Sequence, residues 1–93
     1  MFERVLRRMQ DKVRKREYVV TLHAEDEMSK DGLAVYDIER VVSTGGIVER
    51  QKDKETAEWK YRITGESDGG NEVEVIAKIS PTGKLVIITV YSL

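Results

Sequence analysis

The stretch Glu72–Tyr91, EVEVIAKISPTGKLVIITVY, predicts the fold class of this chain. Its first half alternates apolar and polar residues, which places Val73, Val75, Ala77 and Ile79 on one face of a β-strand. A Ser-Pro-Thr-Gly turn follows, and the second half is almost wholly apolar, as is typical of an interior strand. The chain is therefore expected to end in two strands joined by a tight turn.

Three further segments upstream have strand patterns. Trp59, Tyr61 and Ile63 alternate with polar residues, so we expect these three side chains to lie in the core. Another strand opens at Ile47 and becomes polar along its length. Residues 18–22 are β-branched, aromatic or aliphatic, which suits a short strand.

Three helices are predicted in the first half of the chain. Residues 2–16 repeat apolar side chains at helical spacing with charges between them, which indicates an amphipathic helix with one buried stripe. Residues 23–30 form a short helix that Gly32 stops, and residues 35–44 form another that ends at Gly45. We expect the second and third helices to form a hairpin.

The length and composition are those of one domain. A chain of 93 residues with 40% hydrophobic and 35% charged residues has room for a single core, so residues 1–93 are assigned to one domain. The predicted architecture is α+β, with N-terminal helices packed on a four- to five-stranded antiparallel sheet.

Several classes of protein are excluded by composition. No apolar run approaches the about 18 residues that cross a bilayer, and the first residues lack a secretory hydrophobic region, so no membrane contact and a cytoplasmic location are expected. The absence of cysteine excludes disulfides, thiolate zinc sites and thiol catalysis, and a single histidine excludes a histidine-rich metal centre. We expect neither a metal nor a cofactor.

The net charge of −1 is unevenly distributed. Residues 1–17 hold seven Lys/Arg against three Asp/Glu, a local charge of +4, and the remainder of the chain holds 9 against 14, a charge of −5. These cations form a solvated helix face, or they contact RNA phosphate or an acidic protein. We expect the apolar stripe of residues 2–16 to dock on the body of the domain, because burying large apolar side chains outweighs exposed charge pairs.

Five residues are candidates for a functional site. His23 is the only histidine, the residue type whose unperturbed pKa lies near neutral, and it lies where a strand meets a helix; it is the candidate general base, and a capping or packing role is the alternative. Lys60 and Arg62 share one strand face, and Lys78 lies opposite the apolar row of the next strand, so these three form a candidate RNA-binding patch or an ordinary solvated one. Tyr91 lies on one face of the last strand and is a candidate hydrogen-bond donor.

Four segments together resemble one known family. They are LHAEDEM at Leu22–Met28, DGL at Asp31–Leu33, DIERVV at Asp37–Val42 and GKLVIITVY at Gly83–Tyr91. The assembly resembles the domain-of-unknown-function 4258 family over residues 18–93, and most of the basic amphipathic helix of residues 1–17 lies outside the resemblance.

The resemblance implies a fold like the small RelE and barnase-like ribonuclease toxins, and a toxin–antitoxin setting. Such toxins cleave RNA without metal: a base takes the proton of the ribose 2′-hydroxyl, cations stabilise the phosphorane, and an acid protonates the leaving oxygen. His23 matches the motif histidine of the family, and Tyr91 lies in its closing strand. Asp31 stands where relatives commonly have arginine, which removes a cation that could contact phosphate.

The sequence therefore predicts a toxin-like, metal-independent endoribonuclease, or a catalytically weakened relative, with His23 and Tyr91 as catalytic residues. The alternative is a non-enzymatic protein-interaction domain. The first hypothesis predicts RNA and an antitoxin-like protein as partners, and the second predicts another protein or a second copy of this chain.

Overall fold

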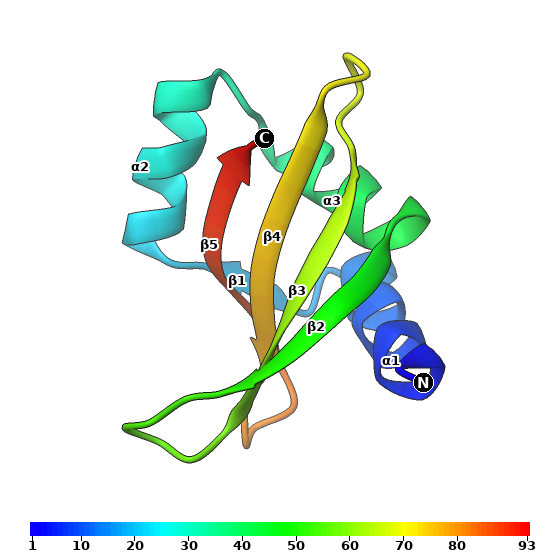
Figure 1. Ribbon diagram of the computed structural model, residues 1–93, viewed down its shortest axis with the longest axis vertical. Helices are drawn as coiled ribbons and strands as arrows, with labels where there is room; N and C mark the ends of the chain where they lie inside the picture. Colours follow the sequence, from blue (N-terminus) through cyan, green and yellow to red (C-terminus); the bar gives the residue numbers. More distant parts are fainter.

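The chain folds into three helices and one five-stranded sheet, as a computed structural model that describes residues 1–93 (Figure 1). This confirms the predicted α+β class. The elements in chain order are α1 (Glu3–Arg14), β1 (Tyr18–Val20), α2 (Leu22–Asp31), α3 (Val35–Thr44), β2 (Gly46–Lys52), β3 (Trp59–Glu66), β4 (Glu72–Ile79) and β5 (Leu85–Ser92).

The sheet is mixed, so the expectation of a purely antiparallel sheet is wrong for one strand. The strand order is β1-β5-β4-β3-β2, and β2 to β5 form an antiparallel meander. The short β1 pairs in parallel with the start of β5, with Tyr18 beside Leu85 and Val20 beside Ile87. Residue patterns predict a strand but not its direction. Here the chain passes directly from β1 into α2, and both elements contact β5. Residues 18–31 therefore lie alongside β5.

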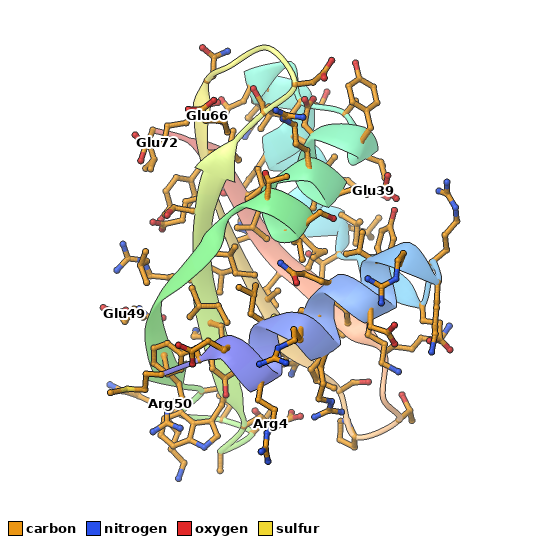
Figure 2. All side chains as sticks on the ribbon, turned by 90° about the vertical axis from the view of Figure 1, so that its right-hand side faces the viewer. Arg4, Glu39, Glu49, Arg50, Glu66 and Glu72 are labelled. Atoms are coloured by element: carbon orange, nitrogen blue, oxygen red, sulfur yellow. The ribbon has the colours of Figure 1, made fainter.

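The core lies between the sheet and the helices. Figure 2 shows the sheet on one side of the molecule and the helices on the other. In the apolar row predicted on β4, Val73, Val75 and Ala77 are buried and Ile79 is half-buried, and interior strand β5 contributes Leu85, Ile87 and Val90. Strand β3 contributes Ile63, and the helices contribute Met9 and Val13 from α1, Ala24 and Met28 from α2, and Ile38, Val41 and Val42 from α3.

The second and third helices, α2 and α3, do not form the expected hairpin. Gly32 adopts the left-handed conformation (φ 67°) and ends α2, as predicted. Beyond it α2 and α3 diverge, because α2 packs on β5 whereas α3 packs on β3 and on α1 (Figure 1). Each helix therefore covers a different half of the sheet.

The apolar stripe of α1 docks on the domain as expected. Met9 and Val13 are buried, and the ring of Phe2 meets that of Tyr61 edge-on at a centroid distance of 6.0 Å. The amide of Gln10 donates to the carbonyl oxygens of Val42 and Ser43, each at 3.2 Å, which satisfies acceptors at the end of α3. The positively charged side of α1 consequently faces solvent.

Trp59 is not a core residue, in contrast to the sequence prediction. Ile63 is buried and Tyr61 is half-buried, but Trp59 is 42% exposed. The predicted alternation is correct, but the beginning of β3 extends beyond the helices that would cover it. The guanidinium of Arg50 instead lies 3.9 Å from the centroid of the indole.

Tyr18 joins β1 to α3. Its phenol donates to Glu39 at 2.5 Å, and the guanidinium of Arg16 lies 3.5 Å from the same carboxylate. Burial, assisted by the hydrogen bond to Glu39, raises the pKa of Tyr18 to about 12. The phenol therefore stays protonated and keeps its donor role at all ordinary pH values.

The end of α3 touches β3 at a contact that only glycine allows. A Cβ on Gly45 would overlap the carbonyl oxygen of Thr64 and would lie 2.5 Å from that of Val41. Gly65 lies against the same point, because a Cβ there would lie 3.1 Å from the Cα of Gly45. At the neighbouring Gly46 a Cβ would meet nothing within 4 Å.

We predict that Gly45→Ala lowers the free energy of unfolding by about 1–3 kcal/mol, because the backbone of α3 or β3 must move away from the new methyl group. The matched control Gly46→Ala, one residue away, should change it by no more than about 1 kcal/mol in either direction. Urea denaturation followed by circular dichroism measures both values. Equal stability of the two variants would mean that the contact is not tight.

Candidate functional site

One face of the sheet has no helix on it and carries most of the polar side chains predicted to act. We call this the open face; it is the sheet face opposite the three helices (Figure 2). Arg62 of β3, Glu74 of β4 and Tyr91 of β5 lie on it, since their strand neighbours Ile63, Val75 and Val90 are in the core. The antiparallel register therefore brings side chains from three strands together.

These side chains are joined by hydrogen bonds and ion pairs, and we call them, together with Glu49, the Glu74 network. One oxygen of Glu74 accepts from Nη2 of Arg62 at 3.0 Å, and the other oxygen accepts from the phenol of Tyr91. Nη1 of Arg62 also lies 3.2 Å from Glu49 of the edge strand β2. The network is thus a row of alternating hydrogen-bond acceptors and donors that crosses four strands.

Glu74 is almost fully enclosed although no helix covers it. The residue is 2% exposed, because Arg62 and Tyr91 lie against its carboxylate. The hydrogen bond to Glu74 is the largest cause of a raised pKa of Arg62, and burial of Arg62 opposes it. The Nε atom of Arg62 is buried without a hydrogen-bond partner.

The other two predicted cations lie further along the open face. Nζ of Lys78 is 3.1 Å from Glu58, so this cation is already paired with a carboxylate. The register that sets Tyr61 beside Ala77 places Lys60 next to Lys78. The structure thus brings Arg62 together with Tyr91 through Glu74, and it places Lys60 and Lys78 further along the strands, with Ile76 between Lys78 and Glu74.

His23 lies on α2 rather than on the sheet. Its side chain is 67% exposed, and its Nε2 is 3.2 Å from an oxygen of Glu27, one helical turn later. The cap of α2 is Thr21, whose hydroxyl oxygen accepts from the amide of Ala24 at 3.1 Å. Both alternatives considered for His23, capping and packing, are therefore wrong, and its catalytic role stays a prediction.

The carboxylates of α2 complete the edge of β5. Since β1 pairs only with the start of that strand, the amides further along need other acceptors. Glu27 accepts from the amide of Val90 at 3.1 Å, and Asp31 accepts from that of Ser92 at 3.0 Å. Asp31, which stands where the resemblance implies an arginine, thus has a structural role here.

This edge also relates His23 to Tyr91. The imidazole contacts Glu27, and Glu27 holds the amide of the residue before Tyr91. No hydrogen bond joins His23 to Tyr91 directly, and none of the five hollows on the surface is lined by His23, Arg62, Lys78 or Tyr91. The Glu74 network is consequently a site on an open sheet surface and not in a cleft.

Two further findings concern cofactors and membranes. No three His, Cys, Asp or Glu side chains are grouped so that they could hold a metal ion. None of the helices is both long enough and apolar enough to cross a membrane.

Sequence reasoning missed Glu74 and Glu49 as members of the site. The available signal was an acidic residue between the apolar residues Val73 and Val75. Its meaning depended on register, because the pattern alone does not indicate that Tyr91 lies directly across from Glu74 on β5 and that Arg62 lies diagonally across from it on β3.

The comparisons with known proteins gave one match. The family model described as Domain of unknown function (DUF4258) matches residues 20–92, which agrees with the predicted resemblance over residues 18–93. No curated protein and no solved structure matches the chain.

The edge of β5 provides a test of what α2 contributes. Glu27→Ala leaves the amide of Val90 without an acceptor, so we expect it to lower the free energy of unfolding by about 1–3 kcal/mol. Asp26→Ala is the matched control, since that exposed carboxylate meets only Lys30 and should cost less than about 0.5 kcal/mol. Thermal denaturation of both variants decides the matter, and an equal effect would contradict the assigned role of Glu27.

Proposed function

This chain belongs to the DUF4258 family, and we propose that it is a metal-independent endoribonuclease of the toxin type that acts on its open sheet face. The observation that carries the proposal is the Glu74 network, in which a carboxylate, a guanidinium and a phenol meet on a surface that no helix covers. Metal-free cleavage of RNA requires these kinds of group: a proton acceptor, a cation and a proton donor.

The burial of Glu74 decides the proposed roles of Tyr91 and Glu74 in proton transfer. Because the carboxylate is 2% exposed, a substrate meets the phenol of Tyr91 first. The phenol oxygen takes the proton of the ribose 2′-hydroxyl while its own proton passes to Glu74. Tyr91 is then the catalytic residue, and Glu74 is a positioning residue that also stores the proton.

The remaining steps follow from the same geometry. The 2′-oxygen attacks phosphorus, a 2′,3′-cyclic phosphate forms, and the bond to the 5′-oxygen breaks. Arg62, held between Glu49 and Glu74, stabilises the negative charge that develops on the phosphorane. His23 takes the role of general acid in this scheme instead of the general base expected from the sequence: from the edge of the strand that carries Tyr91, it donates a proton to the departing 5′-oxygen.

A purely structural role explains the network less well. Replacing a buried ion pair by apolar residues is often neutral or stabilising, and the neighbouring Ile76 occupies the same face without any charge. Arg62 also keeps a buried Nε without an acceptor, which costs stability. A strand needs none of these polar groups to pair, so we assign them to function.

The same proposal includes the partners. RNA is the substrate, Lys60 and Lys78 flank the network on the phosphate side, and an antitoxin-like protein covers the open face when the enzyme is inhibited. Removal of Lys78 from its pair with Glu58 would accompany RNA binding, because a phosphate competes for the same cation.

We predict that the purified protein cleaves single-stranded RNA in the presence of EDTA and leaves 2′,3′-cyclic phosphate ends. Tyr91→Phe, which removes only the hydroxyl, should lower kcat by about 10²–10⁴-fold. Tyr36→Phe is the matched control, since that tyrosine is exposed on α3 and its hydroxyl makes no hydrogen bond to protein. Full activity of Tyr91→Phe would refute the role of Tyr91, and cleavage that stops with EDTA would refute the metal-free chemistry.

One observation favours a second function, a non-enzymatic interaction domain. Two of the three predicted RNA-binding cations are already paired with carboxylates: Arg62 with Glu49 and Glu74, and Lys78 with Glu58. A face with balanced charge attracts RNA weakly. Such a face suits a protein partner that brings its own complementary charges.

Growth on induced expression separates the two functions. If the chain is a ribonuclease, the parent should arrest growth, whereas His23→Ala, which removes an exposed side chain with little effect on stability, should not. Expression is compared by immunoblot so that both proteins are present in equal amounts. A harmless parent favours the interaction domain, and an equally toxic His23→Ala variant removes His23 from the mechanism.

A further inference from the structure

A second charged surface lies on the helix side of the edge strand β2, away from the Glu74 network. Docking of the apolar stripe of α1 leaves the arginines of its other side facing solvent. The N-terminal part of α1 approaches β2 in Figure 2, where Arg4 and Arg50 lie at the same end of the molecule. We call this the basic surface; it comprises Arg4, Arg7 and Arg8 of α1, Arg50 and Lys52 of β2, and Trp59 of β3.

The cations of the basic surface are not neutralised. Elsewhere on the protein most cations have an acidic neighbour. Asp11 pairs with both Arg14 and Lys15, and on the open face Arg62 and Lys78 each pair with a glutamate. None of the five cations of the basic surface forms an ion pair with a carboxylate. A body with a net negative charge thus presents one region of concentrated positive charge.

The surface is also hollowed along its length. One hollow of about 580 Å³ runs along the outer side of α1 and is lined by Arg4, Arg7 and Arg8, among others. A second, of about 310 Å³, lies between α1 and the sheet and is lined by Arg4, Arg8 and Arg50. Arg4 and Arg8 line both hollows, so a track of basic side chains leads from α1 to Arg50 of β2.

An aromatic side chain stands at the β2 end of this track. Trp59 is the only tryptophan of the chain and is 42% exposed. The guanidinium of Arg50 lies 3.9 Å from its ring centroid, and the ammonium of Lys52 lies 5.3 Å from it. Indole and guanidinium planes are the groups on which unpaired bases stack, and neighbouring cations hold the backbone that connects the bases.

We propose that the basic surface binds single-stranded RNA, with phosphates along Arg4, Arg7 and Arg8 and a base stacked at Trp59. An acidic peptide would satisfy the cations but has no group that requires an exposed indole. The choice of RNA rests on the proposed function, whereas the site is a different one. Glu49 belongs to the open face, and Arg50, the next residue, belongs to the basic surface. A single RNA strand that crosses the edge of β2 can therefore occupy both surfaces.

The test measures binding without cleavage. The probe is a fluorescent oligouridine with 2′-O-methyl groups, which a reaction that needs the 2′-hydroxyl cannot cut, and anisotropy gives Kd as a function of salt. Removing two of the three proposed phosphate contacts of α1 in Arg4→Gln/Arg8→Gln should lower the slope of log K against log salt by about 1.4 and weaken binding roughly 25-fold at 0.1 M salt. The control Lys30→Gln/Lys84→Gln removes the same charge elsewhere and should change Kd less than about threefold.

Trp59 gives an independent signal because its emission is the only tryptophan emission of the protein. Binding of the probe should quench it in the parent and in the control. Equal loss of affinity in both double variants, unchanged emission, or tighter binding of poly-glutamate than of the probe would overturn the proposal, the last pointing to an acidic protein instead. Probe binding by a protein that cleaves no RNA would refute the proposed endoribonuclease and leave this surface intact.

Discussion

The structure depends on supplying partners to both edges of β5. This strand is apolar and lies inside the fold, so each of its amide and carbonyl groups needs a hydrogen-bond partner. On one edge β4 pairs along its whole length. On the other, β1 provides only three residues, and the side chains of α2 continue where it ends: the Thr21 hydroxyl donates to the carbonyl oxygen of Ile88, and Glu27 and Asp31 accept from amides. This edge fixes α2 in place, and α2 carries His23.

The sheet has two faces with different physical requirements. On the covered face, close contact is the constraint, and the approach of α3 to β3 at Gly45 and Gly65 leaves no room for a Cβ. On the open face, satisfaction of polar groups is the constraint. Glu74 is enclosed there by two partners rather than by a helix, so its environment depends on the positions of Arg62 and Tyr91. Groups held in this way are oriented before any substrate arrives.

Charge is divided between surfaces in a similar manner. On the open face Arg62 and Lys78 are paired with carboxylates, whereas α1 and β2 expose arginines that have no such neighbours. The amphipathic pattern of α1 serves both needs, because the stripe that packs on α3 fixes the direction of the opposite side. Docking and contact with RNA were alternatives for this helix when only its sequence was considered, and in the structure the docked helix still exposes Arg4, Arg7 and Arg8.

Local patterns determined much of this protein. The alternation in β4, the stop at Gly32, the ends of α3 and the amphipathic side of α1 all follow from spacing and residue type, which act over a few neighbouring residues. The sequence also indicated that His23 lies near the start of a helix and that Arg62 lies on the polar side of its strand. What it could not provide was every relation between distant segments: the parallel direction of β1, the exposure of Trp59, the separation of α2 from α3, and the meeting of Arg62, Glu74 and Tyr91. Those depend on strand direction, register and coverage, which are set by packing across the whole core and leave no mark in the spacing of residues along the chain.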